Sequence, residues 1–204
     1  MNKWIKYTLL LALIVLVGYN SIYFRKLSDV RDAAKAESFD AGAYSVHFLH
    51  TVLPASVDKA IDLPLLSRTL SDNPSNAFSW SHAPNDGNTR FFFVKGAGVI
   101  TRIDSESAAL SVEGLPVVIE TKYIIGNAAR DGSGLITVDD FTTMTEMNAV
   151  SEALDQLIRT EVVPPFLARA IPGARVRFTG GLELHRDKPL PDTLDVIPMT
   201  LTIQ

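Results

Sequence analysis

The stretch TRFFFVKGAGVITRID, residues 89–104, indicates the fold class of this chain. Its three phenylalanines and its β-branched residues are typical of a β-strand, and the stretch is long for a single strand. Gly96 and Gly98 stand in its middle, where a long strand must bend or bulge if its sheet is to curl. We therefore expect one long, bent strand that begins a curled sheet.

Further strands and one helix follow this stretch. Residues 108–114 alternate apolar and polar side chains, which is the period of a half-buried strand, and VVIETKYII, residues 117–125, reads as a third strand. An apolar stripe then predicts a helix that begins near Thr143 and stops at Pro164 and Pro165. Two more strands are expected over ARVRFTGGLEL, residues 174–184, and LDVIPMTLTI, residues 194–203.

Three strands, one helix and two strands is the element order of an OB fold. We therefore predict an α+β protein in which residues 89–204 form an OB-like five-stranded β-barrel, with a helix between strands 3 and 4 that plugs the end of the barrel.

The residues before this domain predict two further parts of the chain. Residues 27–88 read as a helical region and linker: a polar stalk comes first, and Tyr44, Phe48 and Val52 then recur at helical spacing. Pro54 divides this helical segment, and residues 71–88 are dense in Asn, Ser, Pro and Gly, which marks a boundary. Residues 1–26 form the remaining part, a membrane anchor or signal segment.

The apolar run Tyr7–Phe24 holds no charged residue. At about 1.5 Å per residue it is about 27 Å long as a helix, close to the hydrocarbon thickness of a bilayer. Bulky residues occupy most candidate cleavage sites after it, so an uncleaved transmembrane helix is favoured over a signal peptide. Since only six residues precede the run, export of the remaining body is the simpler arrangement.

The charge balance excludes one class of partner. Residues 1–26 hold four of the 19 Lys and Arg and none of the 23 Asp and Glu, so the remainder of the chain carries a net charge of −8. An acidic body without a basic stripe makes nucleic acid an unsuitable partner. The chain also has no cysteine, so neither disulfides nor lipidation on a cysteine is possible.

Several segments together resemble one family. They include YNSIYFRKL from Tyr19, GNTRFFFVKGAG from Gly87, EVVPPF from Glu161 and VRFTGGLEL from Val176. The chain resembles the predicted periplasmic lipoproteins, the domain of unknown function numbered 2291. This resemblance implies a bacterial envelope protein without an established activity, often encoded beside sugar-type ABC transporters.

The resemblance also sets the expected location and partners. It implies a bacterial inner-membrane protein, single-pass, with its main domain in the periplasm. Its possible partners are then an ABC transporter permease or a periplasmic sugar-binding protein. Because the chain lacks the cysteine that a lipoprotein acylates, we expect attachment through the Tyr7–Phe24 helix.

The stretch GNAARDGSGLITVDDF, residues 126–141, contains part of a calcium-loop pattern. Asp131, Ser133 and Asp140 fall at ligand positions 3, 5 and 12 of an EF-hand loop. Position 1 is Ala129, however, and a predicted strand precedes the loop where an EF-hand has a helix. These three residues are therefore weak calcium candidates, and we expect no metal site.

Two interpretations of this stretch stay open. Its glycines and polar side chains could simply shape a strand-to-helix connection. Alternatively, Asn127, Arg130, Asp131 and Ser133 form a ligand or partner site, in which Arg130 and Asp131 offer a forked donor and an acceptor to sugar hydroxyls or to a partner's backbone.

No motif commits the chain to catalysis. It has no G-x-S-x-G elbow, no cysteine nucleophile and no glycine-rich phosphate loop after a strand, and we expect neither catalytic residues nor a cofactor. The sequence therefore predicts a non-catalytic, membrane-anchored periplasmic accessory or binding protein associated with a sugar-type ABC transport system. A hydrolase with a site assembled across the fold and a calcium-stabilised structural protein are the alternatives.

Overall fold

The structure is a computed structural model that describes residues 4–7, 39–83 and 87–204. The chain divides into two compact units, Met1–Phe39 and Asp40–Gln204, and the second contains every element below. Residues 40–88 thus share this unit with the predicted 89–204 domain. Apart from Tyr7, the predicted membrane helix Tyr7–Phe24 lies outside the described residues. Within the described ranges, no helix is long and apolar enough to span a bilayer.

Short helices open the second unit. Asp40 caps the first of them, because its side chain accepts a hydrogen bond of 2.9 Å from the backbone N–H of Ala43. The segment that was predicted as two helices divided at Pro54 is instead a succession of short pieces. They are α3 (Ala41–His47), a π-helix (Phe48–Val52), a 3-10 helix (Pro54–Lys59), the two-residue strand β1 (Ile61–Asp62), α4 (Leu63–Asp72) and α5 (Pro74–Phe78).

A six-stranded sheet forms the centre of this unit. Besides β1 it contains β2 (Thr89–Ile103), β3 (Ser107–Val112), β4 (Leu115–Glu120), β5 (Arg175–His185) and β6 (Leu194–Ile203). The five long strands pair in an unbroken ring, from β2 to β3, β4, β6 and β5 and back to β2. The β4–β6 and β1–β2 pairs are parallel and the others antiparallel. The small strand β1 is the one that the sequence did not predict.

The predicted helix between the third and fourth long strands is present. It comprises α7 (Met144–Leu157), a π-helical turn (Ile158–Val162) and α8 (Val163–Leu167), and it follows the short α6 (Ala128–Gly132) and a 3-10 turn (Val138–Asp140). The helix begins as predicted, with a capping box between Thr143 and Glu146. Its predicted end was wrong, because Pro164 and Pro165 lie in the first turn of α8, where a missing N–H costs nothing.

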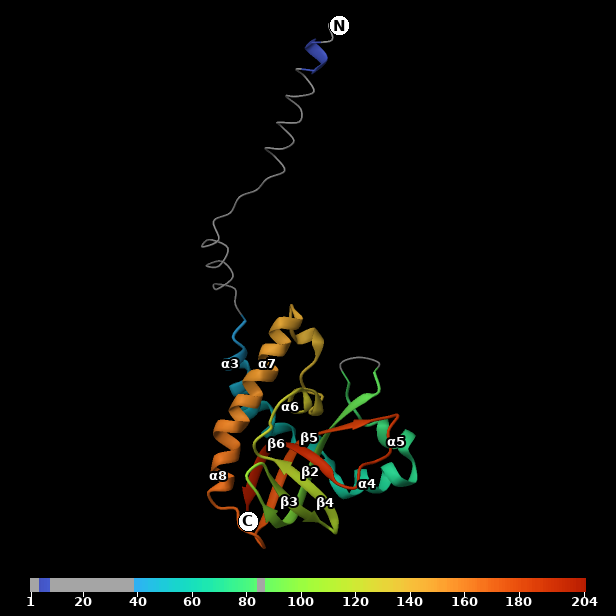
Figure 1. Cartoon of the computed structure of the whole chain (residues 1–204), viewed down its shortest axis with the longest axis vertical. Coiled ribbons are helices and arrows are strands. Elements are labelled where there is room, and N and C mark those ends of the chain that lie inside the picture. The colour runs from blue at the N-terminus through green and yellow to red at the C-terminus, as the bar shows by residue number, and fades with distance from the viewer. Residues whose placement is uncertain (1–3, 8–38, 84–86) are drawn as a thin grey trace. The chain divides into compact units, whose positions relative to one another are not determined.

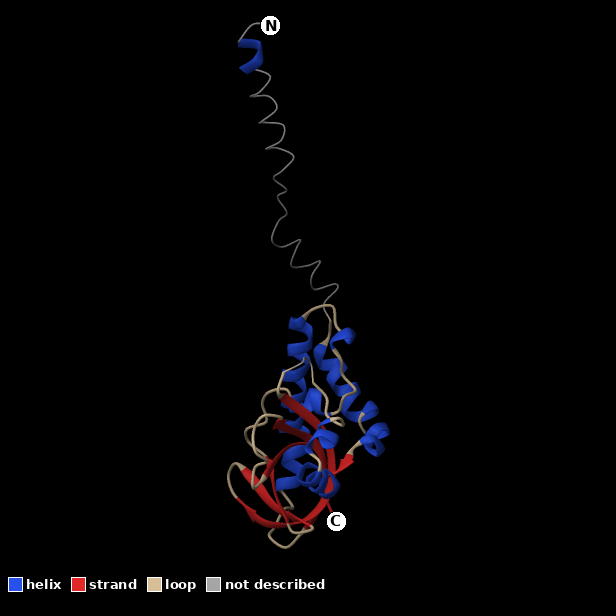
Figure 2. Cartoon of the chain, turned by 90° about the vertical axis from the view of Figure 1, so that its right-hand side faces the viewer, coloured by secondary structure: helices blue, strands red, loops and turns tan. Residues whose placement is uncertain are grey.

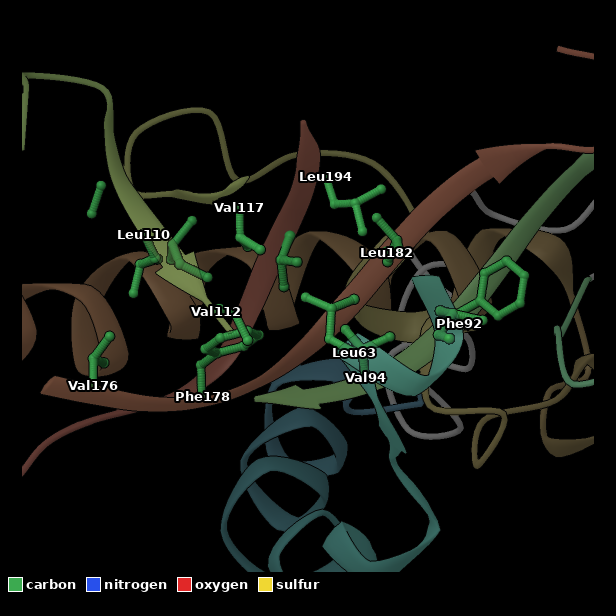
Figure 3. Close-up of a cluster of buried hydrophobic side chains, with 14 of the residues drawn as sticks. Leu63, Phe92, Val94, Leu110, Val112, Val117, Val176, Phe178, Leu182 and Leu194 are labelled. Carbon is green, nitrogen blue, oxygen red and sulfur yellow. The ribbon is translucent and has the colours of Figure 1, made fainter. Parts of the chain in front are cut away.

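One hydrophobic cluster takes side chains from all five strands of the ring (Figure 3). Phe92 and Val94 of β2 contribute to it, as do Phe178 and Leu182 of β5, and Leu63 of α4 packs against them. These side chains occupy alternate positions along their strands, so they share one face of the sheet. This cluster lies on the opposite side of the sheet from α6.

The other face of the same strands is covered at one end by α6. A Cβ atom added to Gly181 of β5 would overlap the carbonyl oxygen of Ala128, so the helix lies directly on the strand. Phe91 and Phe93, which alternate with Phe92, are 4% and 2% exposed on this side. The first half of β2 is therefore buried on both faces, which explains its three consecutive phenylalanines. Helices α3 and α7 pack side by side beyond α6 (Figures 1 and 2).

Candidate functional site

The same outer face is open where α6 ends. A groove of about 570 Å³ lies over the second half of β2 and the start of β5, and we call it the β2–β5 groove. The residues that line it are Val57, Asp62, Pro64, Lys95–Val99, Ser111–Gly114, Arg175 and Arg177–Thr179. This volume falls within the range of small-molecule sites in proteins.

Main chain forms the floor of the groove. The pairing of β2 with β1 ends at Lys95 and its pairing with β3 begins at Val99, so Gly96–Gly98 has no neighbour on that edge among the described strands. Gly96 and Gly98 are both required by close contacts: an added Cβ would lie 2.7 Å from the Phe178 ring in the first case and 2.8 Å from the carbonyl oxygen of Ser111 in the second. The floor is therefore main chain without large side chains, exposed at Ala97, half-buried at Gly96 and buried at Gly98.

Two walls flank this floor. One is the segment from β1 into α4, which contributes Asp62 and Pro64. The other is the β3–β4 turn, in which Glu113 and Gly114 both have positive φ, at 52° and 87°. Positive φ at both central residues is typical of the tight two-residue hairpin turn, which holds Glu113 at the rim of the groove.

Three basic residues of β2 and β5 line the groove: Lys95, Arg175 and Arg177. In the β2–β5 pairing, Lys95 is opposite Thr179, and Ala97 is opposite Arg177. Arg175 lies two residues before Arg177 and therefore on the same face of β5. Lys95 donates a hydrogen bond to the carbonyl oxygen of Val57 at 3.4 Å. The two arginines are exposed, and within the described part of the chain neither has a carboxylate within ion-pair distance.

The structure places the predicted site residues Arg130 and Asp131 elsewhere, in the interior. They belong to α6 rather than to an exposed loop, and their side chains are 2% and 4% exposed. The Nε and Nη2 atoms of Arg130 donate to the two carboxylate oxygens of Asp131 at 2.6 and 2.9 Å, and Nη1 donates to the carbonyl oxygen of Met147 at 3.3 Å. This buried pair ties α6 to α7.

The other predicted site residues also have partners inside the protein. Asn127 is exposed and accepts a hydrogen bond from Ser151 at 3.4 Å, while the buried Ser133 bonds to the carbonyl oxygen of Arg130. Asp140, a weak calcium candidate, accepts from the backbone N–H and the hydroxyl of Thr137. A role of Asn127, Arg130, Asp131 and Ser133 in ligand or partner binding stays a prediction. Among the described residues, no three His, Cys, Asp or Glu side chains are grouped to hold a metal ion.

A smaller hollow of about 390 Å³ reaches Asp131 from the surface. His82 and Arg90 line it, and burial lowers the pKa of His82. The Nε atom of Arg90 is buried without a hydrogen-bond partner. Both oxygens of the Asp131 carboxylate accept hydrogen bonds from Arg130. This hollow therefore offers fewer unpaired binding groups than the β2–β5 groove.

The sequence predicted the strand over residues 174–184 but not the groove. The alternation of Arg175 and Arg177 with apolar residues shows that both arginines share the outer face, and that signal was available. The positions of Arg177 opposite Ala97 and of Arg175 opposite Val99 depend on the strand register, which no local pattern determines.

The ring order and the helix position define the class of the fold. A crystal structure of an OB-fold protein from Thermotoga maritima is similar to this chain, with a TM-score of 0.75 and 23% sequence identity. The match covers 82% of this chain and 100% of that chain. The fold is therefore an OB fold of the α+β class, as the element order predicted.

The particular family follows from the sequence. The family model described as "Predicted periplasmic lipoprotein", domain of unknown function 2291, matches residues 12–202, and the chain belongs to this family. The predicted resemblance is thereby confirmed, and the family description supports a periplasmic, membrane-associated location. No curated protein matches the chain.

Proposed function

We propose that this protein is a non-catalytic binding protein of the periplasm that is held at the inner membrane by Tyr7–Phe24 and serves a sugar-type ABC transport system. The observation that carries the proposal is the β2–β5 groove, an open hollow on the outer face of the OB ring. Its accessible backbone and its free arginines are groups that bind and orient a molecule.

The chemistry of the groove favours binding over catalysis. Its lining contains no histidine and no cysteine, and its two hydroxyl groups are those of Ser111 and Thr179. Thr179 is engaged, since its hydroxyl lies 2.7 Å from the Thr200 hydroxyl. A serine nucleophile requires an adjacent general base, and no imidazole lines the groove to supply one.

The link to transport rests on the family resemblance, which names proteins encoded beside sugar-type ABC transporters. The periplasmic, membrane-associated location of the family is compatible with it. The candidate partners are the permease of such a transporter and its periplasmic sugar-binding protein. In this proposal the groove holds the transported molecule or an exposed segment of one of these proteins.

Purification of the full-length protein from membranes, with identification of the co-purifying proteins, tests the proposal. A permease or a sugar-binding protein should be recovered with the wild type. Ala97→Trp places a bulky side chain in the groove and should reduce that recovery. Thr101→Trp changes another exposed position of β2 outside the groove lining and is the matched control. Recovery of neither partner with the wild type would contradict the proposal.

A further inference from the structure

We infer that the ligand of the β2–β5 groove is a small polyhydroxylated anion, a sugar-like molecule with one carboxylate or phosphate group. This inference rests on the proposed function and specifies what the groove binds. Three observations carry it: the charge on one face, the carboxylates on the walls and the backbone on the floor.

The first observation is a segregation of charge on the outer face of β2, β5 and β6. Arg177 is opposite Thr202 of β6, and the backbone N–H of Gln204 donates to the carbonyl oxygen of Arg175. Lys95 is a diagonal neighbour of Arg177 across the β2–β5 pair, at a distance that long side chains can bridge. No carboxylate is opposite either arginine in these pairings, whereas Lys95 is opposite Asp62 of β1.

This arrangement suits an anionic group. Two arginines two residues apart on one strand face are about 7 Å apart at their Cα atoms, so both guanidinium groups can reach one bound anion. Guanidinium groups bind carboxylate and phosphate with paired, charge-assisted hydrogen bonds. The nearby side chains of Thr202 and Gln204 add hydrogen-bonding groups.

The second observation is that the walls carry the opposite charge. Asp62 and Glu113 line the groove, one on the β1–α4 side and the other on the β3–β4 turn, and both are exposed. Carboxylates accept hydrogen bonds from hydroxyl groups and repel a second anionic group. The ligand should therefore carry hydroxyl groups toward the walls and its single negative charge toward β5.

The third observation is the floor. Ala97 is exposed and Gly96 is half-buried, while Gly98 is buried beside Ser111 and Val112 of β3, so the accessible part of the unpaired edge is the main chain at Gly96 and Ala97. A free strand edge offers both N–H donors and C=O acceptors. The edge is open only at Gly96 and Ala97, which is about 7 Å of strand. This length fits a compact molecule better than an added β-strand.

Equilibrium binding to the full-length protein in detergent, measured by calorimetry, tests the inference. The probes are glucuronate, glucose 6-phosphate, glucose and inorganic phosphate at up to millimolar concentration. We expect at least one sugar anion to bind at least about tenfold more tightly than glucose and than inorganic phosphate, because each charge-assisted hydrogen bond supplies enough free energy for that factor. The ratio of glucuronate to glucose 6-phosphate affinity tells whether the site prefers carboxylate or phosphate.

Variants locate the site. The double variant Arg175→Gln/Arg177→Gln should weaken sugar-anion binding at least about tenfold. Asp62→Asn/Glu113→Gln should also weaken it, and Ala97→Trp should abolish it. Arg68→Gln removes an exposed cation of α4 outside the groove and should change nothing. A thermal melt of each variant shows that the fold is intact.

Two results overturn the inference. One is that no sugar anion binds, and the other is that glucose binds as tightly as the anions and the arginine variant binds like the wild type. Failure of the proposed function and failure of this inference give different results. If Ala97→Trp reduces partner recovery while no anion binds, the proposed function stands and this inference falls. If sugar anions bind but neither partner is recovered with the wild type, the inference stands without the transport link.

Discussion

The two halves of the β2–β5 pair differ in how they are buried. Over Phe91–Val94 the strands are covered on both faces, by the core of the ring on one side and by α6 on the other. Over Lys95–Val99 the inner face is still packed, but the outer face is open and lined by cations. One continuous pair of strands thus provides a rigid support at one end and a recognition surface at the other.

The comparison separates residues that hold the fold together from residues that are free to bind. Charged groups occur in both halves, since Arg130 and Asp131 cover the first and Arg175 and Arg177 line the second. In the covered half the charges neutralise each other. In the open half the arginines have no such partner among the described residues, and that difference makes the open half the better candidate site.

The largest expected effect is the loss of one partner of the buried pair. Arg130→Met leaves the buried carboxylate of Asp131 without its guanidinium, and we expect a loss of about 3–5 kcal/mol in the free energy of unfolding. Urea denaturation of the full-length protein in detergent measures it. The double variant Arg130→Met/Asp131→Leu removes both charges and should recover most of that loss. A single variant as stable as the wild type would show that the covered half does not depend on this pair.

A second effect concerns Asp155, which is 6% exposed on α7 beside the covered half. Burial raises the pKa of this carboxyl from 3.8 to about 6, against the opposing charges of Arg159 and Arg130. The folded protein therefore binds a proton that the unfolded chain has already released between these pH values. The free energy of unfolding should fall as the pH rises through this interval, by up to about 3 kcal/mol.

The variant Asp155→Asn isolates this contribution from that of other carboxyl groups. Its stability relative to the wild type should be higher at pH 7 than at pH 4. Glu152→Gln alters an exposed carboxylate of the same helix and should show no such difference between the two pH values. If wild type and Asp155→Asn depend on pH in the same way, the pKa of Asp155 is not raised by folding.

A third effect tests the close approach of α6. Gly181→Ala inserts a methyl group where the Ala128 carbonyl oxygen lies, so α6 must move away from the sheet. We expect a destabilisation of about 1–3 kcal/mol, as for other overpacked sites. Ala97→Val adds bulk to the same face in the open half, where space is available, and should stay within about 0.5 kcal/mol. Equal losses in a melting experiment would mean that the two halves are equally covered.

Much of the fold could be predicted from local patterns. The five long strands, the helix before the fourth of them and its capping box at Thr143 all follow from alternation, helical periodicity and turn residues. Strand β1 could not be predicted because a strand of two residues is too short to show an alternation of apolar and polar side chains. The predicted strand over residues 117–125 ends early, at Glu120, since β4 has neighbours in β3 and β6 only that far.

The site was harder to predict for a physical reason. Arg130 and Asp131 looked exposed because charged residues beside glycines are usually on a surface. They are buried because each satisfies the other, which depends on the packing of α6 between the sheet and α7. Likewise, the groove depends on which strands leave the edge of β2 uncovered at Gly96–Gly98, and that is a property of the pairing between distant segments.

The smallest expected effect completes the comparison. Arg177 is exposed on the open half and has no ion pair among the described residues, so Arg177→Ala should change the free energy of unfolding by less than about 0.5 kcal/mol. A urea titration of this variant beside Arg130→Met compares the two halves directly, since one change removes a guanidinium from β5 in the open half and the other removes one from α6 over the covered half. A loss above about 1 kcal/mol would mean that Arg177 supports the fold. The groove could then no longer be regarded as a surface whose charged side chains are free to bind. A near-zero change leaves Arg177 as a charged side chain that the fold does not need, which is what a residue kept for binding requires.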